Sequence, residues 1–161
     1  MASPAPSPQF ELEPGTSSDL DDIMAIMTAA FSTEYGEAWT RSQLSGILPM
    51  TGVSLVVARD GDCAAAAGFS LARTVADEAE LLLIAVDPRF RRRGVGRRLL
   101  DHFIAGASAA RVRRVHLEVR DGNPAVAMYE ALGFEPVGRR QDYYLGGDRR
   151  RHDAITLARS L

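Results

Sequence analysis

One segment, residues 78–109, constrains the fold more than any other part of the chain. It opens with an apolar run, LLLIAV at residues 81–86, continues through a loop that contains Gly94 and Gly96, and ends in a helical pattern of apolar residues. A run that is apolar on both faces is typical of a central strand covered on both sides. We therefore predict a central strand over residues 78–86 with helices on both faces, followed by a helix over about residues 94–109.

The rest of the chain alternates between strand and helix periodicity. The other predicted strands lie near residues 10–13, 53–58, 63–75, 113–119, 134–144 and 152–157. The other predicted helices lie at about residues 16–32, 40–47 and 123–132, with Thr16, Ser17 or Ser18 and then Thr40 as caps. Strands, then two strand–helix units, then a hairpin predict an α/β domain with a mixed sheet flanked by helices.

The length of 161 residues suits one domain, which we expect over residues 9–161. The Ala/Ser/Pro-rich residues 1–8 are expected to form a disordered tail. Cys63 is the only cysteine and stands in an apolar run, so we expect a buried structural thiol and a reducing compartment. The first ten residues lack the pattern of a signal peptide, and the longest apolar run is too short to span a bilayer. We therefore expect a cytoplasmic protein without a membrane partner.

Charge is divided unevenly between the two halves of the chain. Residues 1–88 hold three arginines and thirteen acidic residues, and residues 89–161 hold sixteen arginines and eight acidic residues. All nineteen basic residues are arginines, whose forked guanidinium suits phosphate and carboxylate groups. The basic half suits a polyanionic ligand and the acidic half a cationic one, while two solvated faces would give the same counts.

The loop at residues 91–97, RRRGVGR, lies directly between the apolar strand and the following helix. The first N–H groups of a helix lack intrahelical partners, and glycines let an anion approach them closely, so this context predicts a phosphate site. A Walker loop needs a lysine, which the chain does not contain, and a dinucleotide fingerprint needs a third glycine where Leu99 stands. A tight turn with solvated arginines remains the alternative.

The pattern Arg91-x-x-Gly94-x-Gly96 after IAVDP resembles the cofactor motif of the GNAT-family N-acetyltransferases. The similarity continues through LEVRDGNPAVAMYEALGFE and GRRQDYYLGGDRRRHDAITL, which resemble the RimI-type bacterial N-terminal acetyltransferases of that family. It covers residues from about 10 to 158. The resemblance implies a mostly antiparallel central sheet with one splayed parallel pair, and acetyl-CoA as the cosubstrate.

The resemblance also implies which residues bind the cofactor. Loop amides would hold the pyrophosphate, and the edge of the apolar strand would pair with the pantetheine arm. The residues concerned are Ile84, Ala85, Val86, Arg91, Arg92, Arg93, Gly94, Val95, Gly96, Arg97 and Asn123.

Two residues are candidates for the proton transfers of acetyl transfer. Glu118 alternates with the apolar set of its strand, and partial burial in a cleft would raise its pKa towards the working pH. A solvated glutamate, or one paired with the nearby Arg120, is the alternative. Tyr129 falls on a helical stripe with Val126 and Leu132, which is also ordinary core spacing. The resemblance implies that Glu118 is the base and Tyr129 the acid, although the interval between them is one residue shorter than is usual in the RimI-type group.

The resemblance implies an acceptor groove flanked by Trp39, Tyr143 and Tyr144, and a protein N-terminal α-amine as the acceptor, with a ribosomal protein as its source. A small-molecule amine or a lysine side chain is an alternative acceptor, and an acetyl-CoA-binding module without turnover is an alternative function. His116 and His152 form no ligand pattern with other residues, so we expect no metal. We expect no direct contact with nucleic acid.

Overall fold

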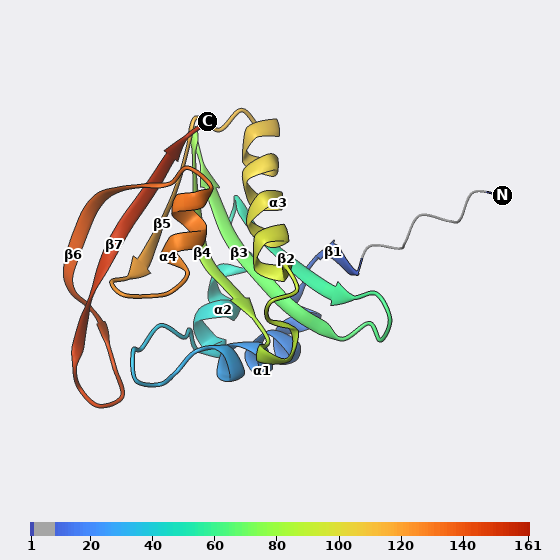
Figure 1. Cartoon of the computed structure of the whole chain (residues 1–161), viewed down its shortest axis with the longest axis horizontal. Coiled ribbons are helices and arrows are strands. Elements are labelled where there is room, and N and C mark those ends of the chain that lie inside the picture. Colours follow the sequence, from blue (N-terminus) through green and yellow to red (C-terminus); the bar gives the residue numbers. More distant parts are fainter. Residues whose placement is uncertain (2–8) are drawn as a thin grey trace.

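The computed structural model of the chain describes residues 1 and 9–161 and contains one seven-stranded sheet in the order β1-β2-β3-β4-β5-β7-β6 (Figure 1). The strands are β1 (Phe10–Pro14), β2 (Val53–Asp60), β3 (Ala66–Val75), β4 (Glu78–Val86), β5 (Arg114–Arg120), β6 (Glu135–Leu145) and β7 (Arg151–Ser160). β4 and β5 pair in parallel and the other neighbours are antiparallel, which confirms the predicted mixed sheet. The predicted disordered tail falls almost entirely on residues 2–8, which lie outside the described residues.

Helices cover both faces of the sheet. They are α1 (Leu20–Ala30), α2 (Arg41–Ile47), α3 (Val95–Ala109) and α4 (Val126–Ala131), with 3-10 turns at Ser17–Asp19 and Pro88–Phe90. Thr16 and Thr40 each accept a backbone N–H from the turn that follows, as predicted for caps. In the described part of the chain, no helix is long and apolar enough to cross a membrane.

A bulge at Leu82 divides the central strand β4 into two parts. Leu71 of β3 pairs with Leu83 and the next β3 residue, Ala72, pairs with Leu81, so Leu82 is the extra residue. An extra residue moves every later side chain to the opposite face. Leu81 accordingly packs in the cluster under α3, whereas Leu83 packs in the cluster under α1 and α2. The prediction that helices cover both faces of this strand is therefore confirmed.

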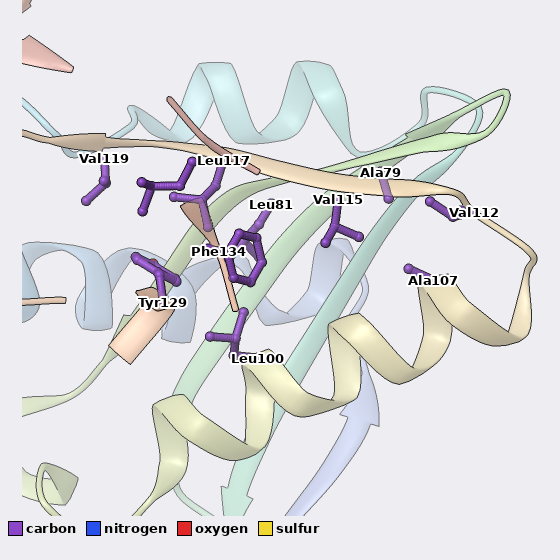
Figure 2. Close-up of a cluster of buried hydrophobic side chains, with 11 residues drawn as sticks. Ala79, Leu81, Leu100, Ala107, Val112, Val115, Leu117, Val119, Tyr129 and Phe134 are labelled. Carbon is purple, nitrogen blue, oxygen red and sulfur yellow. The ribbon is translucent and has the colours of Figure 1, made fainter. Parts of the chain in front are cut away.

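The cluster between α3, α4 and the sheet fixes the helix that follows β5 (Figure 2). Leu100 of α3 and Leu117 of β5 are fully or almost fully buried and point toward each other across this cluster. The Tyr129 ring joins them and meets Phe134 edge to face, with ring centroids 5.9 Å apart. Full burial of each aliphatic side chain contributes roughly 1.5–3 kcal/mol, so α4 is held by packing although it has only six residues.

The expected environment of Cys63 was wrong. The side chain is exposed, and β3 begins at Ala66 rather than at residue 63. The Asp60 carboxylate accepts the backbone N–H groups of Asp62 and Cys63 at 2.9 and 3.0 Å, which extends the turn, and Ala64 completes it at a φ of 57°. The thiol therefore lies on a hairpin turn and not in the core.

Candidate active site

A pocket of about 560 Å³ opens where the two parallel strands separate. β4 pairs with β5 only from Glu78 to Leu81, opposite Arg114 to Leu117, and the strands diverge from the Leu82 bulge onward (Figure 1). The pocket is lined by the diverging ends of both strands, the α1–α2 connection, the start of α4 and the end of β6. The lining residues include every predicted site residue outside the glycine loop, together with Arg91 of that loop.

The β4 end of the pocket presents a strand edge. Ile84, Ala85 and Val86 line the pocket and lie beyond the last residue that pairs with β5. Their other edge is hydrogen-bonded to β3, through partners such as Phe69 for Ala85. Within the described part of the chain, the β5-facing edge thus has no strand partner over residues 82–86, and its backbone groups can pair with an extended ligand.

The glycine loop ends at the first turn of α3. Gly94 is the N-cap and adopts a φ of 80°, a left-handed conformation that favours glycine. Helical hydrogen bonding begins with the Arg98 N–H, which donates to the Gly94 carbonyl at 3.0 Å. The amides of residues 95–97 therefore point out of the helix end, where an anion can accept them. Just before the loop, the buried Asp87 accepts the Arg89 N–H at 2.9 Å and holds the 3-10 turn.

The arginine side chains of this loop have different surroundings. Arg91 lines the pocket, and its Nη2 donates to the Ala30 carbonyl at 3.3 Å. Arg93 turns back to the Asp60 carboxylate, 3.5 Å away, and its guanidinium carbon lies 4.9 Å from the centroid of the Phe10 ring. Arg93 thus packs its side chain against Phe10 and Asp60 at the protein surface, with 34% of the side chain exposed, while its backbone remains part of the loop.

Two further loop arginines differ again. Arg97 pairs with Asp101 one turn along α3, at 3.1 Å, and both side chains are about half exposed. Arg92 holds a φ of 61°, which places a non-glycine residue in the left-handed region two residues before Gly94, where the chain turns into α3. The loop conformation is therefore set by local backbone geometry as well as by the packed Arg93.

Glu118 stands on β5 one residue past the last position that pairs with β4. Its side chain is 12% exposed, and Arg140 Nε of β6 lies 2.8 Å from Oε1. Oε2 is buried and has no hydrogen-bond partner among the described residues. Burial raises the pKa of the Glu118 carboxyl; the Arg140 charge opposes this shift, and the Glu80 charge adds to it. The direction agrees with the sequence prediction, but the arginine that pairs with Glu118 is Arg140 and not Arg120.

Tyr129 belongs both to the core and to the pocket. Its ring packs on Phe134, and the residue also lines the pocket, as Glu118 does. Burial raises the pKa of the phenol, and the Glu37 charge adds to the shift, so the hydroxyl is protonated at neutral pH. The two interpretations of the helical stripe, core packing and a place in the site, are therefore compatible.

The predicted acceptor residues all line this pocket. Trp39 lines the pocket and packs against the α1–α2 cluster. Tyr143 and Tyr144 line it from β6, with ring centroids 4.9 Å apart and planes at 85°. The Tyr144 hydroxyl donates to the Glu118 carbonyl at 3.5 Å. Asn123, predicted as a cofactor contact, lines the pocket at the start of α4.

Several pocket residues were absent from the sequence prediction. Glu37 and Arg120 form an ion pair in the wall, and Tyr35 stacks on the guanidinium. Glu80 lies beside His116, with 3.8 Å between the carboxylate and Nε2. The alternation of side chains along β5 placed Arg120 on the same face as Glu118, and this pattern could have predicted its place in the pocket. No pattern in the neighbouring sequence indicated Glu37. Within residues 1 and 9–161, no group of three or more His, Cys, Asp or Glu residues is arranged to hold a metal ion, and the absence of a metal stays a prediction.

Known proteins resemble this chain in sequence and in structure. The family described as Acetyltransferase (GNAT) family matches residues 20–134. The [ribosomal protein bS18]-alanine N-acetyltransferase of Escherichia coli (strain K12) is 45% identical over 93 residues, a match that spans 57% of this chain and 62% of that protein. The chain thus matches less than two thirds of the length of this curated relative.

Two crystal structures extend the comparison beyond that segment. The ribosomal-protein-S18-alanine N-acetyltransferase from Escherichia coli superposes with a TM-score of 0.83 at 31% identity, covering 94% of this chain and 93% of that chain. Arabidopsis thaliana NAA60 in complex with acetyl-CoA superposes with a TM-score of 0.79 at 20% identity, covering 94% and 98% respectively, and shares the fold.

Proposed function

The chain belongs to the GNAT acetyltransferase family. We propose that it transfers the acetyl group of acetyl-CoA directly to an amine, and that this amine is the N-terminal α-amine of a protein. The observation that carries the proposal is the separation of β4 from β5. It gives one pocket a free strand edge, a carboxylate with a raised pKa and a protonated phenol, and the glycine loop follows directly after that strand edge.

The residues around the strand edge fit the chemistry of acetyl-CoA. The amides of residues 95–97 at the start of α3 would hold the pyrophosphate, since they point out of the helix end without intrahelical partners. The free edge of Ile84 to Val86 would pair with the two amide groups of the pantetheine arm. That arrangement would place the thioester carbonyl near the Leu82 bulge, where backbone N–H groups can stabilise the developing oxyanion.

Glu118 would act as the base. At pH 7 an α-ammonium with a pKa of about 8 costs roughly 1 kcal/mol to deprotonate, whereas a lysine with a pKa of about 10.4 costs roughly 4–5 kcal/mol. A carboxylate whose pKa is raised by burial is a sufficient base for the first and a poor one for the second. The free Oε2 is the atom that would take the proton, directly or through one water.

Tyr129 would act as the acid. The amine nitrogen attacks the carbonyl carbon, the C–S bond breaks, and the electron pair leaves on the CoA sulfur. The Tyr129 hydroxyl is protonated at neutral pH, so it can donate a hydrogen bond and then its proton to this thiolate. No acetylated residue is required, and the exposed Cys63 stands on the β2–β3 turn, outside the residues that line the pocket.

The acceptor would enter beside Trp39, Tyr143 and Tyr144. The two Escherichia coli proteins compared above are named as alanine N-acetyltransferases of ribosomal protein bS18 or S18, and we propose the same class of acceptor, the N-terminus of a ribosomal protein, for this chain. An α-amine has a lower pKa than a lysine side chain and can be deprotonated by a weaker base. The modest strength of Glu118 as a base therefore supports an α-amine as the acceptor.

The test is CoA release with a panel of acceptors. A peptide with a free N-terminal alanine should be acetylated, and the same peptide with a blocked N-terminus and an internal lysine should not. Polyamines and aminoglycosides complete the panel. Binding of acetyl-CoA without turnover on any acceptor would refute the proposal that the protein is an acetyltransferase. Turnover on the polyamine alone would refute the proposal that the acceptor is a protein N-terminus.

A further inference from the structure

A buried ion pair in the pocket wall takes no part in the proton transfers proposed above. Arg120 Nε lies 3.3 Å from Glu37 Oε1, and both side chains are only 11% exposed. The Nε–H has no well-directed hydrogen bond, so the contact is electrostatic. The guanidinium carbon also lies 3.6 Å from the centroid of the Tyr35 ring. Removing one partner of such a pair leaves the other as an uncompensated buried charge, so the pair fixes residues 35–37 against the end of β5.

Asn123 extends this contact to the helix that carries Tyr129. Its Nδ2 donates to Glu37 Oε1 at 3.1 Å, and its Oδ1 accepts the Ala125 N–H at 2.9 Å. Ala125 is the N-cap of α4 and has no capping side chain of its own, and its carbonyl accepts the Tyr129 N–H at 3.2 Å. A helix of six residues depends on such contacts, because its own hydrogen bonds are too few to hold it. Glu37 is thus two hydrogen bonds away from the first turn of α4.

The α1–α2 connection is held on its other side by the β6–β7 hairpin (Figure 1). The Gly147 N–H donates to the Thr33 carbonyl at 2.8 Å, and the Tyr35 ring meets His152 edge to face, with centroids 5.2 Å apart. The connection therefore runs between the hairpin tip and the start of α4, and it carries Trp39 into the pocket.

We propose that Glu37 and Arg120 are positioning residues for acetyl transfer, because their ion pair and Asn123 hold the acceptor side of the pocket and the helix of Tyr129 in one arrangement. The inference rests on the proposed function. A displacement of about 1 Å between reacting groups can lower a rate roughly 100-fold, so a tie that sets this distance acts on turnover and not on acetyl-CoA binding. Among the described residues, no hydrogen bond or ion pair joins Glu37 or Arg120 to the glycine loop that would hold the cofactor.

The test compares Glu37→Gln with Glu37→Ala. Gln keeps an oxygen that can accept from Asn123 but loses the ion pair, and Ala loses both contacts. We expect kcat and kcat/KM for the acceptor peptide to fall in the order wild type, Gln, Ala, with a loss of roughly 10- to 100-fold for Ala. KM for acetyl-CoA should stay almost unchanged. Glu34→Gln is the matched control, because Glu34 lies exposed in the same connection, and it should behave as wild type.

Amide hydrogen exchange gives a readout that does not depend on turnover. In Glu37→Ala the amides of residues 125–129 should exchange faster, while those of the buried strand β4 should not change. Unchanged kcat in both Glu37 variants, or a rise in KM for acetyl-CoA that matches the loss of kcat, would overturn the inference. A wild type that acetylates no acceptor would overturn the proposed function, and unchanged exchange at residues 125–129 would then separately refute the tie.

Discussion

Two substitutions at Gly96 should have different effects: a small side chain should stabilise the protein, and a long one should weaken cofactor binding. A Cβ added at Gly96 would lie 3.5 Å from Val86 Cγ2 and 3.9 Å from Met128 Sδ, which are ordinary contacts. Gly96 is the second residue of α3, and replacing glycine by alanine in a helix is worth about 0.5–1 kcal/mol. Gly96→Ala should therefore raise the melting temperature of the free protein by about 1–4 °C.

A longer side chain at the same position should block the cofactor. Its Cβ points between β4 and α4, so the side chain of Gly96→Leu would fill the passage from the glycine loop to the strand edge. We expect the affinity for acetyl-CoA to fall at least about 10-fold, or about 1.4 kcal/mol. Gly94→Ala should differ again, since Gly94 holds a φ of 80° and an alanine there costs roughly 1–2 kcal/mol of stability.

Calorimetric titration with acetyl-CoA and thermal melting of the free proteins check these expectations. Gly106→Leu is the matched control, because a Cβ at Gly106 of the same helix meets nothing within 4 Å and lies far from the loop in sequence. It should bind acetyl-CoA as the wild type does. Wild-type affinity in a folded Gly96→Leu protein would refute the assignment of this loop to the cofactor.

Two predictions concern the proton transfers. Burial raises the pKa of Glu118, so the wild-type rate should rise as pH rises through that pKa. Glu118→Gln should lower kcat and abolish this rise in the pH profile. An unchanged pH profile in the variant would exclude Glu118 as the base. Because a raised carboxyl pKa costs stability once the group ionises, the same variant should melt higher than wild type at pH 7, and the difference should vanish in acid. Tyr129→Phe keeps the ring contact with Phe134, so the free energy of unfolding should change by no more than about 1 kcal/mol. The variant should lower kcat about 100-fold. Full activity of the variant would exclude Tyr129 as the acid.

Structural features that depend on residues close together in the chain could be predicted from the sequence. The apolar run of β4, the caps at Thr16 and Thr40 and the glycine loop before α3 each depend on residues close together in the chain, and the structure has them where expected. Alternation along β5 likewise placed Glu118 on the face opposite its apolar neighbours. These patterns were sufficient for the order and type of the elements.

Features that depend on contacts between distant segments were not predictable. The Leu82 bulge lies in a run whose residues are all apolar, so the side-chain pattern carries no period that could reveal the change of face. Glu37 and Arg120 stand 83 positions apart, and only the folded chain brings the α1–α2 connection to the end of β5. Cys63 was misplaced because an apolar sequence reads as a strand, whereas the Asp60 carboxylate holds these residues in a turn.

The central claim is that this pocket moves acetyl from CoA to an α-amine. Its most direct test is to incubate the protein with acetyl-CoA and a peptide that carries both a free N-terminal alanine and an internal lysine, and to locate the acetyl group by tandem mass spectrometry while CoA release is followed. We predict one acetyl group on the terminal nitrogen for each CoA released, and its loss in Glu118→Gln. Acetylation of the lysine, or no CoA release above the uncatalysed rate, would contradict the claim.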